Sequence, residues 1–233
     1  MDDSELLLRH LGSSYRFEHI ELRRLTTDRV RSFGSVETAE TYSLTAPYMP
    51  VADGLISEAI FGAGPGASDR FGRIDLPSPI EHPFAPDGRW LLDFVLVLPL
   101  AFRCVELNGS AVSQDSITGL YVKVVARRNR LRHLLANPPS EEDMRTRMLA
   151  HERATLAKWI QVLFHNTRGV SEDLTPRARV GLLDRLGSSR DEILDRLVAF
   201  DHAVGAERQA VPTVQETRCV LVSLGFEVTA KAT

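Results

Sequence analysis

The chain has 233 residues, of which 43% are hydrophobic and 25% are charged, a composition that predicts a globular protein with a buried core. Collagen-like, fibrous and wholly disordered classes are excluded. The formal net charge is only -3, from 28 Lys+Arg against 31 Asp+Glu, so nothing in the overall charge favours a protein that coats nucleic acid or a membrane surface.

The chain start and the cysteines predict a cytosolic protein. The sequence opens MDDSELLLRH, without the basic head and continuous apolar core of a signal peptide, and no apolar run approaches the roughly 18 residues of a membrane span. Cys104 and Cys219 have no CxxC spacing, which excludes a disulfide framework and a four-cysteine zinc site. The histidines lack the spacing of paired ligands on a helix, so we expect no metal and no cofactor.

Residues 1–116 are expected to form a compact base of short strands and loops. Phe17, Ile20 and Leu22 suit a strand, and residues 26–34 suit a short helix with Thr27 or Asp28 as its N-cap. Extended chain with turns follows as far as Gly62. The next stretch, GAGPGAS, is interpreted as a connector, because it lacks the Gly-Lys-Ser/Thr ending of a phosphate-binding loop.

The second half of the base contains its most apolar segment. Three prolines between residues 73 and 84 predict an edge strand and a loop there, since proline removes a backbone donor. Residues 90–98 form the most apolar run, which Pro99 ends. We therefore expect residues 90–98 at the buried centre of the base.

Residues 117–169 carry the strongest periodic signal and predict a long antiparallel helical hairpin. The prolines of Asn137-Pro138-Pro139-Ser140 divide the two helices, with Ser140 as the expected N-cap of the second. Apolar residues recur at three and four positions along both helices: Ile117, Leu120, Tyr121, Val124, Val125, Leu131, Leu134 and Leu135 on the first, and Met144, Met148, Thr155, Leu156, Trp159, Val162 and Leu163 on the second.

Charges interrupt both apolar stripes. Arg127 and Glu152 fall at similar heights on the facing helices, where they either pair with each other or face a partner. Residues 119–169 hold ten Lys+Arg and four Asp+Glu, a net charge of +6. Nucleic-acid binding by Arg127, Arg128, Arg130 and Arg132 is the weaker interpretation, because these arginines wind around the helix and lack neighbouring aromatic residues for base stacking.

Residues 170–233 predict further helices that pack on the base. Residues 176–186 and 190–204 look helical, and Pro212 suits the start of another helix. Residues 219–224 fit either that helix or a strand, and residues 226–229 fit a short strand.

The sequence offers no catalytic constellation. A Gly-x-Ser-x-Gly elbow is absent, and Cys104 has no local feature that would activate its thiol. His151 and Glu152 lie about 100° apart on a helix, which suits a solvated or partner-facing patch better than acid-base catalysis. We expect that the protein is not an enzyme.

Several strings, in the same order, resemble the N-terminal clamp region of the bacterial RNA polymerase β′ subunit. Asp53-Gly54-Leu55 and Ile60-Phe61-Gly62 match strings of that family directly, and the segment 94–103 resembles its Val-Leu-Pro-Pro-x-Leu-Arg string. The hairpin string GLYVKVVARRNRLRHLL is similar to the family's clamp helices and places these residues in register: Leu120, Tyr121, Val124, Arg127, Asn129, Arg130 and Leu131.

The departures from that family limit what the resemblance implies. The chain lacks both the four-cysteine zinc ribbon and the Asn-Ala-Asp-Phe-Asp-Gly-Asp catalytic loop, so it cannot polymerise RNA alone. The clamp helices of the family dock region 2 of the sigma factor during initiation and a NusG-type factor during elongation. Carried over by position, the resemblance implies that these residues bind a partner: Arg127, Arg128, Arg130, His151, Glu152 and Arg153.

The sequence thus predicts a mainly α, α+β fold in three parts: a clamp-like base (1–116), a projecting helical hairpin (117–169) and a C-terminal helical segment (170–233). A sigma factor is the expected partner. A NusG-type factor, the polymerase core and, only indirectly, nucleic acid are the alternatives.

Overall fold

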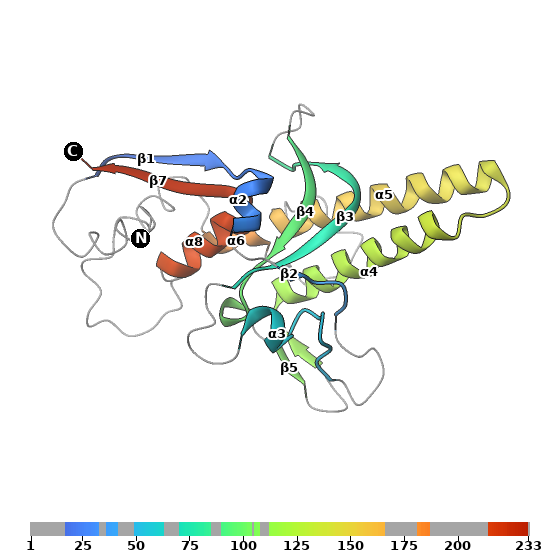
Figure 1. Ribbon diagram of the computed structural model, residues 1–233, viewed down its shortest axis with the longest axis horizontal. Helices are drawn as coiled ribbons and strands as arrows, with labels where there is room; N and C mark the ends of the chain where they lie inside the picture. The colour runs from blue at the N-terminus through green and yellow to red at the C-terminus, as the bar shows by residue number, and fades with distance from the viewer. Residues whose placement is uncertain are drawn as a thin grey trace.

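The computed structural model has a mixed α+β fold and describes residues 17–32, 36–41, 49–62, 70–84, 90–103, 105–107, 112–165, 181–186 and 214–232 (Figure 1). Predictions for residues 170–180 and 190–204, and for Cys104, lie outside these ranges. The elements are β1 (Phe17–Arg24), α2 (Thr27–Ser32), β2 (Val36–Glu37), α3 (Glu58–Phe61), β3 (Gly72–Glu81), β4 (Leu91–Val97), the 3-10 helix η1 (Leu100–Phe102), β5 (Val105–Leu107), β6 (Val112–Gln114), α4 (Ser116–Ala136), α5 (Glu142–Phe164), α6 (Leu182–Leu186), α8 (Val214–Ser223) and β7 (Phe226–Ala232).

The helical hairpin is confirmed, and it projects from one side of the base (Figure 1). Asp115 caps α4 by accepting a hydrogen bond from the Thr118 N–H at 2.8 Å, which satisfies one of the free amides of the first turn. The helix ends at Ala136, before the two prolines. The expected cap of α5 is wrong, because that helix begins at Glu142 with Glu141, not Ser140, at the N-cap position.

The apolar stripes bury the part of the hairpin nearest the base. On α4 every predicted stripe residue except Leu135 is buried, and on α5 burial is complete from Leu156 onward at the apolar positions Trp159, Val162 and Leu163. At the far end, Leu135 and Met144 are exposed by 39% and 49%. These two stripe residues therefore lie outside the core, because the outer turns of the hairpin have no base to pack against.

The main sheet has the strand order β2-β3-β4, so β3 is its middle strand and the predicted edge position is wrong. β3 pairs antiparallel with β4, and its first two residues pair parallel with β2. The register shifts between Asp75 and Ile80, and Pro77 and Pro79 lie within that shift. Proline is tolerated here because the regular ladder is already interrupted.

The segment 90–98 lies in the core as predicted. Val95, Leu96, Val97 and Leu98 are buried, and they join one core with the inner faces of α4 and α5. The Tyr121 hydroxyl from α4 accepts a hydrogen bond from the Leu98 N–H at 3.1 Å and donates to the Leu96 carbonyl at 3.0 Å. The hairpin is thereby joined to the end of β4.

The first and last described strands pair in a second sheet. β1 pairs antiparallel with β7, from Phe17 opposite Ala232 to Arg24 opposite Phe226, which confirms both predicted strands. The ambiguous segment 219–224 is helical as far as Ser223, within α8. The N-terminal and C-terminal parts are therefore one packed unit in the described residues.

An aromatic cluster joins this second sheet to the main one. The buried His82 ring stacks on Trp90 with centroids 3.5 Å apart, and Phe164 and Phe226 meet His82 edge-on. His82 Nδ1 accepts from the Phe84 N–H, so Nε2 carries the proton and donates to the Leu224 carbonyl at 3.0 Å. The strand-ending His82 thus fixes the turn between α8 and β7.

We predict a stability change at alkaline pH that is due to Tyr121. Burial raises the pKa of Tyr121 to about 12 from 10.0, so its contribution to stability is complete below pH 10 and is lost as the pH rises towards 12. The expected loss is roughly 3 kcal/mol. Ultraviolet titration should show one tyrosine that ionises near pH 12 and is missing in Tyr121→Phe.

The variant is also the reference for stability. Burial lowers the pKa of the neighbouring Arg103 to about 10, so above that pH the titration of Arg103 raises the stability of the folded protein while that of Tyr121 lowers it. Comparing the denaturation midpoints of the wild type and Tyr121→Phe isolates the contribution of Tyr121. Identical pH profiles of the two proteins between pH 10 and 12 would contradict the assignment.

Candidate partner-binding surface

Glu152 lies at the centre of the candidate surface, but it is not exposed. Only 2% of its side chain is accessible, and its carboxylate faces α4. Oε1 lies 2.8 Å from Nε of Arg130, and Oε2 lies 3.4 Å from Nη1 of Arg127. The pairing of Arg127 with Glu152, one of the two sequence interpretations, is therefore confirmed.

This geometry changes the role expected for Glu152. A carboxylate buried in this way cannot be an exposed contact, so that expectation is wrong. Its two arginines remain accessible, with 34% of Arg127 and 58% of Arg130 exposed. Glu152 holds two long cationic side chains in fixed positions at the hairpin surface, which reduces the entropy that a partner must remove on binding.

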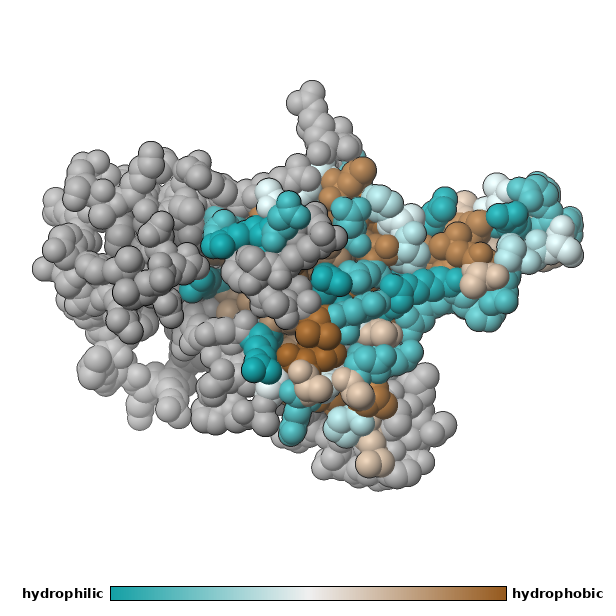
Figure 2. Space-filling model, in the orientation of Figure 1, coloured by the Kyte–Doolittle hydropathy of each residue, from teal (hydrophilic) through white to brown (hydrophobic). Residues whose placement is uncertain are grey.

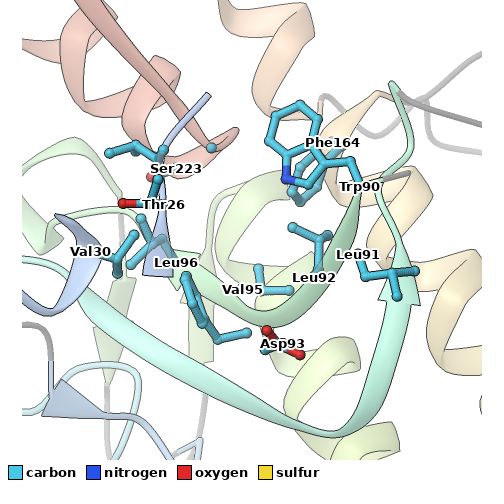
Figure 3. Close-up of a pocket in the computed structure, with 13 residues that line it drawn as sticks. Thr26, Val30, Trp90, Leu91, Leu92, Asp93, Val95, Leu96, Phe164 and Ser223 are labelled. Atoms are coloured by element: carbon cyan, nitrogen blue, oxygen red, sulfur yellow. The ribbon is translucent and has the colours of Figure 1, made fainter. Parts of the chain in front are cut away.

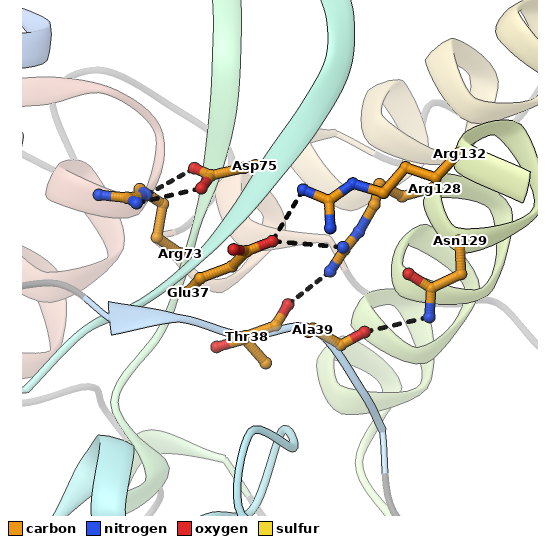
Figure 4. Close-up of polar contacts among 8 residues, drawn as sticks. All are labelled: Glu37, Thr38, Ala39, Arg73, Asp75, Arg128, Asn129 and Arg132. Carbon is orange, nitrogen blue, oxygen red and sulfur yellow. Dashed lines mark hydrogen bonds and ion pairs between the residues drawn. The ribbon is translucent and has the colours of Figure 1, made fainter. Parts of the chain in front are cut away.

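Arg128 does not belong to this surface. Its side chain is fully buried, and Nη2 donates to the Thr38 carbonyl at 2.7 Å (Figure 4). Nη1 lies 3.4 Å from the Glu37 carboxylate. The expectation that Arg128 faces a partner is wrong, because α4 turns this position towards β2 and the chain that follows it.

Neighbouring residues strengthen the contact between α4 and β2. Arg132 reaches the same Glu37 oxygen at 2.8 Å, and the Asn129 side-chain amide donates to the Ala39 carbonyl at 3.0 Å (Figure 4). Burial lowers the pKa of Arg128, and Nε of Arg128 has no hydrogen-bond partner among the described residues. The contact therefore carries a desolvation cost that its hydrogen bonds offset.

His151 and Arg153 are exposed on α5, on either side of Glu152. Positions 151 and 153 are about 200° apart around a helix, so the two side chains lie on opposite sides of the hairpin. Arg153 forms no ion pair with any residue in the described ranges. The structure thus brings together Arg127, Arg130 and Glu152, with His151 and Arg153 flanking them.

Most hairpin arginines are paired with acids. Arg145 lies 3.6 Å from Glu142, Arg147 pairs with Asp143, and the arginines closer to the base pair with Glu37 or Glu152. Hydrophilic residues cover most of the projecting hairpin, with a smaller hydrophobic area between them (Figure 2). A mixed surface of this kind resembles a protein interface more than a row of phosphate contacts.

Sequence reasoning missed Glu37 and Thr38, which hold Arg128. They precede Arg128 by about 90 positions, and no local pattern marks such a contact. Among the described residues, no group of His, Cys, Asp and Glu is arranged to hold a metal ion, and no helix is long and apolar enough to cross a membrane.

Comparisons with known proteins add no family assignment. No protein-family model matches the chain, and a search of curated proteins finds no similar sequence.

We predict that Glu152→Gln destabilises the fold more than a surface change of the same type. Removing the buried charge leaves Arg127 and Arg130 without their counterion, and we expect the free energy of unfolding to fall by about 1 to 3 kcal/mol. This loss is smaller than for a fully buried ion pair, because both arginines contact water. The control Glu142→Gln removes a carboxylate that is 81% exposed and should cost less than about 0.5 kcal/mol. Urea denaturation measures both, and equal losses would refute the buried role.

A second pair of variants tests the attachment of α4 to β2. Arg128→Met leaves the Thr38 carbonyl without its donor and should cost about 2 to 4 kcal/mol. Arg132→Met removes an arginine that is 43% exposed and contacts the same carboxylate, and it should cost less than about 1 kcal/mol. Chemical denaturation of both variants should show this order, and the reverse order would mean that Arg128 is not the anchor.

Proposed function

We propose that the protein is a non-catalytic, clamp-like transcription regulator that binds a sigma factor through the hairpin α4/α5. The resemblance of residues 17–169 to the β′ clamp region supports this partner, and the hairpin's projection from the base supports the mode of binding (Figure 1). Sequestering a sigma factor, or presenting it to polymerase, would in either case alter which promoters are used.

The observation that carries the proposal is the pair of arginines held on Glu152. Arg127 and Arg130 are the two arginines that fall in register with the family's clamp helices, and both remain accessible, by 34% and 58%. Oriented guanidinium groups bind carboxylates with defined geometry and lose little freedom on doing so. They suit an acidic protein surface, and the hairpin's net charge of +6 favours fast association with one.

A protein partner explains the charge arrangement better than nucleic acid does. Of the four arginines first considered for phosphate binding, Arg128 is buried, and Arg127, Arg130 and Arg132 are each shared with a carboxylate. Charges that are already paired release few counterions from a phosphate backbone. The exposed apolar residues Leu135 and Met144 also have a use at a protein interface and none in phosphate binding.

The expected result is direct binding of a host sigma factor, measured by calorimetry after pull-down with the full-length chain. Arg130→Ala and Arg127→Ala should each weaken binding by about tenfold, because each removes a charged contact that is desolvated at the interface. Arg153→Ala tests whether the partner also covers the other side of the hairpin.

The matched control is Arg70→Ala, an exposed arginine of the base, which should bind like the wild type. Circular dichroism and denaturation confirm that each variant is folded. Binding of a NusG-type factor, polymerase core or DNA in place of any sigma factor would overturn the proposed partner. A steep decrease of DNA affinity with salt would favour the nucleic-acid alternative.

A further inference from the structure

The outer edge of β4 faces a cavity of about 420 Å³ in the base. Among the strands that the structure describes, β3 alone pairs with β4, and the cavity lies between β4, the region of Leu25 to Val30, and the end of α8. Thr26, Val30 and Ser223 lie on one side of the cavity, and Trp90 and Phe164 lie on the other (Figure 3). Six consecutive residues of β4, from Leu91 to Leu96, line it.

The Tyr121 hydroxyl shows which backbone groups point away from β3. It binds the carbonyl of Leu96 and the N–H of Leu98, two positions that share one side of a strand. By the same alternation, the N–H and C=O of Phe94 point outward with those of Leu96. Tyr121 therefore closes one end of this edge, and the edge continues from there along the cavity.

The rest of this edge has no hydrogen-bond partner among the described residues. Apart from the ladder to β3 and the Tyr121 hydroxyl, residues 91–97 form no hydrogen bond that involves the described part of the chain. Unpaired strand edges are templates for another strand, and most proteins protect them with charges, bulges or a covering element. Here the edge is instead set in a cavity with apolar walls.

From this arrangement we infer a second binding site: the edge of β4 accepts an extended peptide segment of a partner protein as a fourth strand. Main-chain hydrogen bonds to Phe94 and Leu96 would hold the peptide, and Val30, Trp90 and Phe164 would contact its apolar side chains. At about 3.3 Å per residue, the stretch from Phe94 to Leu96 offers roughly 10 Å of outward-facing edge, enough to pair with about three peptide residues, and the rest of a longer peptide would lie along the cavity.

Asp93 defines one further feature of the peptide. Its exposed carboxylate lines the cavity and forms no ion pair or hydrogen bond with any described residue. A Lys or Arg on the peptide, placed across from Asp93, would complement this charge. The site therefore fits an extended segment of alternating apolar residues that carries one basic side chain, and it does not depend on what the hairpin binds.

The test is a selection of phage-displayed random heptapeptides on the 233-residue chain. Two variants of Phe94 distinguish the loss of its backbone donor from the loss of its side chain. Phe94→Pro removes the outward N–H and leaves the hydrogen bonds between β4 and β3. Phe94→Thr removes the aromatic ring and keeps the N–H. Peptides selected on the wild type should bind Phe94→Pro at least about tenfold more weakly and Phe94→Thr within about threefold, given what one backbone hydrogen bond contributes.

Two further readouts use the selected peptides. Amide exchange at Phe94 and Leu96 should slow on binding, and Asp93→Asn should weaken only peptides that carry Lys or Arg. Failure to select any peptide, equal binding to Phe94→Pro and Phe94→Thr, or unchanged amide exchange at β4 would each overturn the proposal. None of these results depends on sigma-factor binding, so the two proposals fail separately.

Discussion

The burial of one guanidinium group, that of Arg128, determines how the hairpin stands on the base. A fully buried cation is stable only when its donors are used, and two of them are taken by the Thr38 carbonyl and the Glu37 carboxylate. Rotating or sliding α4 would break both contacts and leave the charge without a partner. The hydrophobic stripes hold the helices together, but this polar contact fixes their direction relative to β2.

The buried charge of Glu152 likewise needs its partners, and this pairing separates the two functions of the hairpin residues. Leu120, Tyr121, Val124 and Leu131 are buried and maintain the fold, whereas Arg127 and Arg130 are held at the surface by a carboxylate beneath them. The string that resembles the clamp helices therefore contains both buried residues that maintain the fold and arginines that are held at the surface. Under the proposed function, only the accessible arginines Arg127 and Arg130 bear on the choice of partner.

Local features of the sequence predicted the hairpin, its dividing prolines and the core strand at residues 90–98. Helical periodicity and proline chemistry act within a few residues, so they can be recognised without knowledge of the fold. The burial of Arg128 could not be predicted in this way, because it depends on Glu37 and Thr38, about 90 positions earlier in the chain. The pairing of Glu152 with Arg127 follows from the hairpin, but the depth at which the carboxylate is buried depends on how closely the two helices pack. The middle position of β3 was missed for a related reason: its prolines argue against a central strand unless the register shift that accommodates them is known.

Helix α4 links the two proposed binding sites through a rigid body. Tyr121 in its second turn closes the edge of β4, and Arg130 lies nine residues further, about 14 Å along the helix axis. Because α4 is continuous and anchored by Arg128 between these points, a peptide at the edge of β4 would stabilise the part of the helix that carries the arginines. Coupling between the sites would then arise from the rigidity of α4 alone.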